Sequence, residues 1–446
     1  MRSERKLTTS WDCVYPLLFQ RLARPVLAVS LTGIVALLGC SGGSGGQQKS
    51  PAITTPEAVL ALSQEVTRDA DTITPMDAGA VIPGLTLEEA SQFAAGLAQF
   101  TKVEGSEEGL GPVFNGRSCG ECHLQGGIGG AAFDQTVSVV TRFGAMVNGT
   151  YTDLPEKGGP VMERRSLIEM DPACPVSPEV VPPEATFVSH RTTTPLFGTG
   201  LIEGVPEATL RRLADPDDLD HDGISGRLNM VLNPETGKVE VGRFGWKAQI
   251  SSLSVFSADA YLNEMGITTP LFPTELLPQG QTIDGMDTVP EPEDDGTDTL
   301  HFTHFMRWLA PPPPTPANVS ESGKRGKLVF QQVGCVSCHV PELATGENTT
   351  KALSLKRFAL YSDLLLHDMG DGLADGIRQG EATGSEFRTA PLWGLHLRKF
   401  LLHDGRATSV PEAISLHGGE ATNVMNRYGK LSARDHDDLL TFVESL

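Results

Sequence analysis

Two short motifs of the sequence place a pair of thiols directly before an imidazole. Each has two cysteines three positions apart and a histidine after the second, and the six residues are Cys119, Cys122, His123, Cys335, Cys338 and His339. Two thiols at this spacing can add to the two vinyl groups of one haem, and the adjacent histidine can then ligate its iron. Half of a zinc site and a redox dithiol are the alternatives, but neither half of the chain has a second CxxC pair close enough to complete a tetrahedral zinc set. The motifs therefore predict two covalently bound haem c groups, with His123 and His339 as proximal ligands.

The two motifs lie within a longer internal repeat. Val113-Phe114 and Val329-Phe330 stand at the same distance before their cysteines. Further along, RTTTPLFG at 191–198 is echoed by RTAPLWG at 388–394, and VPEA occurs at both 205–208 and 410–413. The duplication predicts a mainly α fold of two cytochrome c-like haem domains in tandem, with long loop insertions in the first. Regular strand is expected to be incidental.

Two helices of this fold have clear start signals. Thr86 and Glu89 form a capping box, and apolar residues follow at helical spacing. They are Leu87, Ala90, Phe93, Ala94, Leu97 and Phe100. A second capped helix is expected from Ser432 to Leu446, with its apolar side chains packed inward. Both VPEA segments are expected to start helices with proline in the first turn.

Composition divides the chain into five segments. Residues 1–40 have a basic start and an apolar run, and the run ends in a sequence that resembles a bacterial lipoprotein signal with Cys40 as the lipidated residue. A plain cleaved signal is the alternative, and either predicts export to the periplasmic face. Residues 41–69 are expected to be a flexible tether, 70–310 the N-terminal haem domain, 311–317 a proline-rich linker and 318–446 the C-terminal haem domain.

The net charge of -21 excludes some classes of partner. A nucleic acid or an anionic membrane face would repel the protein, so contact with a membrane is expected only through a lipid anchor on Cys40. An acidic surface suits a basic or dipolar electron donor, although a simply solvated surface is the alternative. Among the cysteines, Cys174 has no assigned role, and an inert buried thiol is favoured over a redox function.

The segment from Asp218 to Ser225 resembles the front half of a calcium loop. Oxygen donors stand at alternate positions, Asp218, Asp220 and Asp222, and a glycine follows. The last ligand position of an EF-hand would be Asn229 in place of a bidentate glutamate. Calcium binding and an Asx-rich surface turn are therefore both open.

Several longer motifs resemble a known family. They are FRTAPLWG at 387–394, LHDGRA at 402–407, GTGLIE at 198–203, HDGISGR at 221–227, GRFGWKA at 242–248 and LLLHDMG at 364–370. Together they are similar to the di-haem oxidoreductases, sometimes labelled thiol oxidoreductases, in the bacterial di-haem cytochrome c peroxidase superfamily. The resemblance covers nearly all of the mature chain. It implies an oxidoreductase, but the superfamily also includes a protein-modifying enzyme and oxygenases that cleave rubber.

The resemblance implies a distal ligand for the second haem. Relatives carry Met or Tyr fourteen residues after the histidine of the HDG motif, and this position is His417 here. An iron held by His339 and His417 should have a lower potential than one with a Met ligand. Met369 and His403 are the rival ligands, and a surface histidine at a helix end is the alternative for His417.

The first haem is expected to carry the chemistry. Glu264 lies in a segment similar to the one in which relatives carry a catalytic glutamate, and a carboxylate over the iron can move a proton between the two oxygens of peroxide. Glu203 is the runner-up. Trp246 would lie between the haems as an electron conduit, although a buried Trp is more often part of a core.

These expectations combine into one hypothesis. The chain is predicted to be an exported di-haem c-type oxidoreductase that reduces hydrogen peroxide at one haem, with electrons relayed by the other from a small donor such as a cytochrome or a cupredoxin. A non-catalytic electron-transfer cytochrome, and an oxygenase or protein-modifying enzyme on the same scaffold, are the alternatives.

Overall fold

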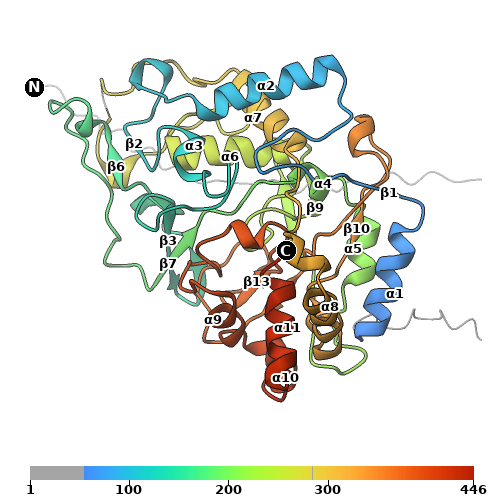
Figure 1. Ribbon diagram of the computed structural model, residues 1–446. Coiled ribbons are helices and arrows are strands. Elements are labelled where there is room, and N and C mark those ends of the chain that lie inside the picture. The colour runs from blue at the N-terminus through green and yellow to red at the C-terminus, as the bar shows by residue number, and fades with distance from the viewer. Residues whose placement is uncertain (1–54, 284) are drawn as a thin grey trace, which may run out of the picture. The chain divides into compact units, whose positions relative to one another are not determined.

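Helices and short strands share the fold. The computed structural model describes residues 55–283 and 285–446 (Figure 1). Of these residues, 34% lie in helices, with 3-10 turns included, and 14% in strands. The expected mainly α fold is therefore corrected to a mixed one, because β pairing between distant segments adds several small sheets that local sequence patterns did not reveal.

The longer helices form two pairs, in which the second partner lies much later in the chain (Figure 1). The helices are α1 Pro56–Thr67, α2 Leu87–Thr101, α3 Cys119–Cys122, α4 Thr199–Glu203, α5 Glu207–Leu213, α6 Leu253–Met265, α7 Thr297–Trp308, α8 Glu321–Val333, α9 Val410–Ser415, α10 Thr422–Tyr428 and α11 Ala433–Val443. Helix α2 packs on α7, and α8 packs on α11.

A glycine lies at each of the two crossings. A Cβ on Gly96 of α2 would meet the backbone of His301 in α7, and one on Gly326 of α8 would meet the backbone of Asp438 in α11. Close helix approach at a small residue is what lets each pair bury its aromatic rings. Phe100 lies 4.5 Å from Phe305 between ring centroids, and Phe330 lies 5.5 Å from Phe442.

The predicted caps are confirmed. Thr86 accepts a hydrogen bond from the Glu89 amide, and the Glu89 carboxylate accepts one from the Thr86 amide. Ser432 caps α11 through the Asp435 amide. The predicted apolar face of α2 needs correction, because Leu87 is 93% exposed. The crossing with α7 at Gly96 selects Phe93 and Phe100 as the buried residues of that helix.

The strands form five small sheets among the described residues. They are β1 Asp71–Thr72, β2 Val113–Phe114, β3 Val139–Val147, β4 Thr150–Thr152, β5 Val161–Met162, β6 Arg165–Ser166, β7 Phe187–Thr192, β8 Met230–Asn233, β9 Lys238–Val241, β10 Leu343–Ala344, β11 Lys356–Phe358, β12 Leu366–Asp368 and β13 Glu386–Arg388. Strand β3 pairs antiparallel with β4, β5 and β7, and its long ladder with β7 runs from Val139 opposite Thr192 to Gly144 opposite Phe187. The other sheets are β2-β6, β8-β9, β12-β13 and β1-β11-β10.

One part of the expected repeat is not structurally equivalent. Val113-Phe114 forms strand β2, whereas Val329-Phe330 lies inside helix α8. The ring that takes the place of Phe330 in the first half is Phe100, because both rings lie about equally far from the histidine of their motif, Phe100 at 5.9 Å from His123 and Phe330 at 6.3 Å from His339. The match of Val-Phe spacing was therefore misleading.

The segment expected to be a tether contains ordered structure. Helix α1 begins after the Thr55 cap, buries Val59 and Leu62, and packs against β10 and the 3-10 turn Cys335–Ser337 of the second motif. Strand β1 then pairs parallel with β11. The ordered fold thus begins well before residue 70, because the apolar face of α1 finds a partner far along the chain.

The proline-rich segment lies inside one compact unit that extends to Leu446. Pro311 and Pro312 are buried and Pro313 is exposed. The predicted domain boundary at 311–317 stays a prediction. Residues 1–54, with the expected signal and Cys40, lie outside the described residues. Within the described part of the chain, every helix is too short or too polar to cross a bilayer.

Candidate functional site

The first thiol motif forms a short helix held to α2. Ser118 caps α3 by accepting a hydrogen bond from the Gly120 amide, and its hydroxyl donates to the Phe100 carbonyl at 3.1 Å. The loop after the motif returns so that His123 Nδ1 donates to the Gly130 carbonyl at 3.2 Å. This hydrogen bond orients the ring and leaves Nε2 free to bind a metal.

The second motif reaches the same arrangement by another route. Its cysteines lie on the 3-10 turn Cys335–Ser337 directly after α8, and His339 Nδ1 donates to the Tyr361 carbonyl at 2.9 Å. Burial lowers the pKa of both His123 and His339 to about 4. Both imidazoles are therefore neutral at pH 7, as iron ligation requires.

A cavity of about 220 Å³ opens beside the second motif. Its lining is largely apolar and comes from α8, α9, α10 and α11 together with the loops around β13. His339 lies on its wall, and so do His417 and Met369. His417 follows α9, where its Nδ1 donates to the Ala413 carbonyl at 2.8 Å, so its Nε2 is also free. Burial is the main cause of the low pKa of His339, and His417 contributes to the same lowering. The two imidazoles therefore lie near one another in one cavity.

The rival ligands lie in the same lining. Met369 follows strand β12. The His403 ring stacks on Phe387 with centroids 4.2 Å apart and an interplanar angle of 21°. Its backbone carbonyl accepts a hydrogen bond from Thr192. Stacking on Phe387 gives the His403 ring a structural role. His417 instead uses Nδ1 as a donor to its own helix, which leaves Nε2 as the ring nitrogen that could bind iron. The position of His417 as the distal ligand stays a prediction.

Two arginines that the sequence analysis missed also line this cavity. Arg388 donates to the carbonyls of Gly245 and Thr389, and Arg398 donates to the Pro391 carbonyl. Within residues 55–283 and 285–446, the Arg398 Nε is buried with no acceptor, and Asp363 is the carboxylate that acts on Arg388. Burial lowers the pKa of both to about 10. Arg388 lies in the FRTAPLWG motif, which was the available signal.

These residues fit a haem. The apolar wall suits the porphyrin, the thiols of Cys335 and Cys338 lie at one side, and free imidazole nitrogens are available for the iron. The guanidiniums of Arg388 and Arg398 suit acidic groups such as the haem propionates.

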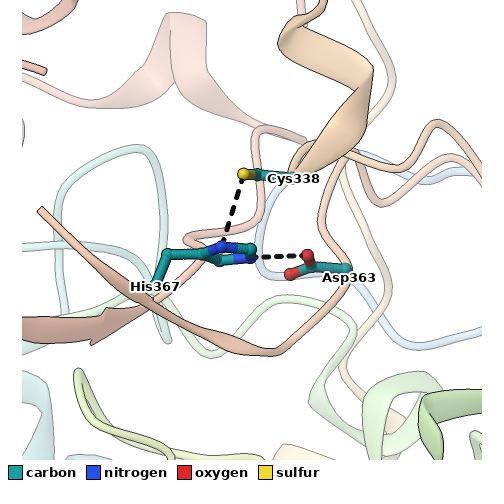
Figure 2. A group of neighbouring side chains, drawn as sticks. All are labelled: Cys338, Asp363 and His367. Atoms are coloured by element: carbon teal, nitrogen blue, oxygen red, sulfur yellow. Dashed lines mark hydrogen bonds and ion pairs between the residues drawn. The ribbon is translucent and has the colours of Figure 1, made fainter. Parts of the chain in front are cut away.

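A buried histidine lies beside the attachment thiol of this site. His367 Nδ1 lies 3.6 Å from Cys338 Sγ, and Nε2 donates to Asp363 at 2.8 Å (Figure 2). Glu420 also accepts from Nδ1, at 2.7 Å. Burial alone would lower the pKa of His367, but Cys338 and Asp363 together hold it well above its ordinary value. If Cys338 forms a thioether bond to a haem, its sulfur can no longer carry a negative charge. The carboxylates of Asp363 and Glu420 would still favour the protonated form of His367.

Glu264 lies near the thiols of the first motif. It is close to the end of α6, where its carbonyl accepts hydrogen bonds from the amides of Asn115 and Gly116. Burial raises the pKa of the Cys122 thiol to about 12, and the nearby Glu264 carboxylate adds to this rise. Burial and then Asp259 raise the pKa of Glu264 itself to about 8.

Two arginines surround this carboxylate. Arg142 of β3 and Arg164 act against the rise in the pKa of Glu264. Arg164 donates to the carbonyls of Thr136 and Val137. The first site therefore has a carboxyl group and two guanidiniums near its thiols. The second site has imidazoles and apolar walls instead. This set also fits a haem that has one polar, proton-exchanging face.

The runner-up carboxylate has a structural role. Glu203 ion-pairs with Arg307 at 2.8 Å and accepts a hydrogen bond from the Leu253 amide at the start of α6. Both contacts hold α4, α6 and α7 together. Glu264 is thus the better candidate for proton transfer.

Trp246 lies in a loop between the two sites. Its ring lines the second cavity, and its Nε1 donates to the Thr192 carbonyl at 2.9 Å. The chain then continues through Thr193, which accepts at its carbonyl from the Ala132 amide, toward the loop that orients His123. Trp246 is therefore placed where a conduit would be, although its role stays a prediction.

The residue after Trp246 anchors this loop. Lys247 is fully buried, and its Nζ donates to the carbonyls of Thr383 and Glu386 and pairs with Asp375 at 3.3 Å. Asp375 in turn pairs with Arg191 at 2.6 Å. A buried lysine with this many partners fixes the neighbouring backbone.

The predicted calcium loop gathers a slightly different set of carboxylates. Asp215, Asp218 and Asp220 have ligand atoms within 4.8 Å of one another. Asp222 lies close by, and burial raises its pKa to about 6 with help from Asp220. Asn229 does not complete the loop, because its side chain donates to the carbonyls of Lys247 and Gln379 elsewhere. Calcium binding by Asp218, Asp220 and Asp222 stays a prediction.

Cys174 is a free thiol packed in the hydrophobic core. Its burial agrees with the predicted inert role. A buried structural thiol of this kind has no path to a redox partner.

Comparison with known proteins gives a family match. Residues 183–446 match the family described as "Di-haem oxidoreductase, putative peroxidase". No curated protein matches the chain. Among solved structures, hydrazine synthase of Kuenenia stuttgartiensis is 13% identical with a TM-score of 0.36, and the alignment covers 95% of this chain and 100% of that one.

Two further solved structures are similar at the same low level. The diheme peroxidase BthA from Burkholderia thailandensis is 14% identical with a TM-score of 0.37, covering 84% of this chain and 92% of that one. A MauG-like protein associated with microbial copper homeostasis is 15% identical with a TM-score of 0.29, covering 56% of this chain and 89% of that one.

Proposed function

The chain belongs to the di-haem oxidoreductase family and is an oxidoreductase, and from this premise we propose that it reduces hydrogen peroxide at its first haem. Membership implies haem cofactors, and the CxxCH motifs support covalent attachment of one haem in each half. The second haem would relay electrons to the first. Each half would then be a cytochrome c-like unit built on one of the two helix pairs.

One observation carries the proposal. Glu264 is a half-buried carboxyl whose backbone carbonyl accepts hydrogen bonds from the amides of Asn115 and Gly116, just before the first motif, and its pKa is raised to about 8. A carboxyl with a pKa near the working pH can both accept and return a proton. The second site instead has His417 near His339, which suits an iron with two strong ligands.

Each side chain would have a distinct task. Haem, when bound, supplies an iron that can take peroxide and exchange electrons. Glu264 would accept the proton from the oxygen nearer the iron and return it to the outer oxygen as the O–O bond breaks. The overall reaction is hydrogen peroxide plus two protons and two electrons to two waters. Trp246 would shorten the electron path from the second site.

Electron paramagnetic resonance of the oxidised holoprotein, with and without peroxide, tests the proposal. We expect one high-spin signal that peroxide changes and one low-spin signal that it leaves alone. In parallel, a reduced small cytochrome c serves as the donor while peroxide is assayed. Two low-spin signals indifferent to peroxide before and after partial reduction, with no peroxide consumed, would contradict the proposal.

A non-catalytic electron carrier is the second candidate. The nearness of His417 to His339 favours it for the second haem, since two imidazoles saturate an iron. If the first iron is saturated as well, the protein only transfers electrons. Carbon monoxide binding to the reduced protein separates the two, because a saturated iron does not take the gas.

We further propose that the protein acts on the periplasmic face of a membrane, attached through lipid on Cys40. The lipoprotein-like signal supports this, and so do the CxxCH motifs, because c-type attachment in bacteria takes place outside the cytoplasmic membrane. A small cytochrome or cupredoxin with a basic face would suit the charge of -21. Association that weakens with added salt is the expected sign of such a donor.

A further inference from the structure

Two more buried carboxyls lie behind Glu264. Glu163 is 1% exposed and Glu179 is 5% exposed. Both carboxyl oxygens of Glu163 are buried without a hydrogen-bond partner within the described part of the chain. An orphaned carboxyl in a protein interior is costly unless it carries a proton or exchanges one. The proposed mechanism has given neither residue a task.

Backbone contacts place Glu163 between the other two. Its amide donates to the Glu179 carboxylate at 2.8 Å, and the Glu179 amide donates to the Glu163 carbonyl at 2.8 Å. On the other side, the Asn115 amide donates to the Glu264 carbonyl at 2.8 Å, and the Asn115 side chain accepts from the Arg164 amide at 3.4 Å. The backbone of Glu163 is therefore bonded to Glu179, and Asn115 links the backbone of the next residue, Arg164, to that of Glu264.

The charges on the three groups agree with this order. Burial raises the pKa of Glu163 well above its ordinary value, and Glu264 and then Glu179 add to the rise, while Arg164 opposes it. Burial raises the pKa of Glu179 to about 7. The remaining charged groups near Glu264 are Asp259 and Arg142.

The outer end of the series reaches the surface. A Cβ on Gly158 would overlap the Glu179 carboxylate, and the next atom it would meet is in the Gln279 side chain. Gly158 and Gln279 belong to surface turns whose neighbours Glu156 and Gly280 are exposed. Glu179 thus lies directly beneath the surface, and Glu264 lies at the haem thiols.

We propose that Glu179, Glu163 and Glu264 form a proton path from the surface to the first haem site. The proposal rests on the proposed peroxide reduction, which consumes two protons for each peroxide. After it has returned peroxide's own proton to the outer oxygen, Glu264 is a carboxylate again, and it passes on the two protons that the second oxygen needs to leave as water. Glu163 then gives its proton to Glu264, Glu179 gives its proton to Glu163, and water restores Glu179. Each carboxyl ends as it began, and the electrons come from the reduced donor.

The test measures proton movement separately from turnover. Infrared spectra of the holoprotein after rapid mixing into D₂O follow the shift of the Glu264 carboxyl C=O band, which Glu264→Gln identifies by its loss. We expect Glu163→Gln to keep that band but to slow its exchange by about tenfold or more, since the relay partner is gone. Glu179→Gln should slow it similarly, and Glu156→Gln, an exposed carboxylate at the same turn, should leave it unchanged.

Each outcome decides something. Unchanged exchange in Glu163→Gln and Glu179→Gln overturns the proton path. If Glu163→Gln does not fold, Glu179→Gln alone decides, because it alters the outer end. Slowed exchange in a wild-type background that consumes no peroxide would keep the path and reject the peroxidase function. If the protein consumes peroxide but neither variant changes the exchange, the peroxidase function is kept and the proton path is rejected.

Discussion

The two thiol motifs share one sequence pattern, yet the side chains that face them differ in kind. Near the first motif are the carboxyls of Glu264 and Glu163 and the guanidiniums of Arg142 and Arg164. The second motif faces an apolar cavity with the imidazole of His417. A proton-exchanging wall suits bond breaking, and an apolar wall with two imidazoles suits an iron that only changes its charge.

The difference teaches that the two halves share a helix pair and a thiol motif, while the side chains around each motif differ. The residues near the first motif come from β3, α6 and the loop before β6, all within the long first half. Those near the second come from the segment directly after α9 and from β12, β13 and the residues beside them, which precede α9 in the chain. Variants that exchange or remove these side chains can break this comparison.

The largest effect is expected from Glu264→Gln. Removing the group that moves the proton should lower the rate of peroxide reduction by about 10²- to 10⁴-fold. The absorption spectrum of the second haem should not change, because Glu264 lies at the other site. Glu203→Gln is the matched control, since its carboxylate pairs with Arg307. Peroxide assays that give equal rates for Glu264→Gln and wild type would remove the proposed distinction between the sites.

Lys247→Met tests how the halves are held together. The variant leaves Arg191 as the one cation that the described residues pair with Asp375, and it removes the donor to the carbonyls of Thr383 and Glu386. Loss of one partner from such a buried group costs about 3–5 kcal/mol of unfolding free energy. Urea denaturation measures it. The exposed Lys238→Met serves as control and should lie within about 0.5 kcal/mol of wild type.

His417→Ala should open the second iron. The reduced variant should bind carbon monoxide, and the potential of that haem should rise by part of the roughly 0.8 V range that axial ligands span. Spectroelectrochemistry and carbon monoxide titration measure both. His396→Ala, an exposed histidine outside the cavity, should change neither. An unchanged second haem in His417→Ala would point to Met369, and Met369→Leu would then show the effect.

The two halves should respond to pH in opposite directions. Burial raises the pKa of Glu264 from 4.5 to about 8. Its contribution to the stability of the first half is therefore fully present below pH 4.5 and is lost as the pH rises through about 8. Hydrogen bonding to Arg325 lowers the pKa of Asp438 from 3.8 to about 2, so its contribution is present above pH 3.8 and is lost as the pH falls through about 2.

Hydrogen exchange of peptides from each half checks this. Protection around α6 should fall between about pH 4.5 and 8 by on the order of a few kcal/mol, while protection of α8 and α11 should hold. Glu264→Gln should remove much of the fall around α6. Parallel changes in both halves would contradict the prediction.

The smallest effects concern the helix caps. Thr86→Ala should cost about 1 kcal/mol, because it removes half of the capping box of α2. Ser320→Ala should cost less than this at α8, since only the Gly323 amide loses its acceptor. Denaturant midpoints measure both, and Ser91→Ala in the exposed middle of α2 is the control. A larger loss for Ser320→Ala would show that the second pair depends more on its start.

Local patterns predicted the caps and the motifs correctly. Thr86 with Glu89 and Ser432 with Asp435 lie three residues apart, so the sequence alone contains the whole interaction. Both VPEA segments also start helices, because α5 begins at Glu207 and α9 begins at Val410. Helix α1 had a readable cap at Thr55, but the glycine-rich stretch before it suggested a tether.

Interactions between distant residues could not be predicted. The ladder of β3 with β7 joins segments far apart in the chain, and neither strand alternates clearly enough to be recognised alone. For the same reason Glu264 was singled out while Glu163 was not, because only the fold brings them together. The pairing of Val113-Phe114 with Val329-Phe330 failed because equal spacing does not imply equal backbone conformation.

The first residues that the structure describes are fastened to the second half of the chain. Helix α1 packs beside the second motif, and β1 pairs with β11. A protease that cuts the chain at the exposed Pro313 would therefore yield two fragments that stay associated, since part of the first fragment is built into the second. The nicked molecule would keep its shape in native buffer and come apart only in denaturant. The two halves are thus interlocked. Neither could be deleted or replaced as a separate module without removing packing and strand pairing from the other.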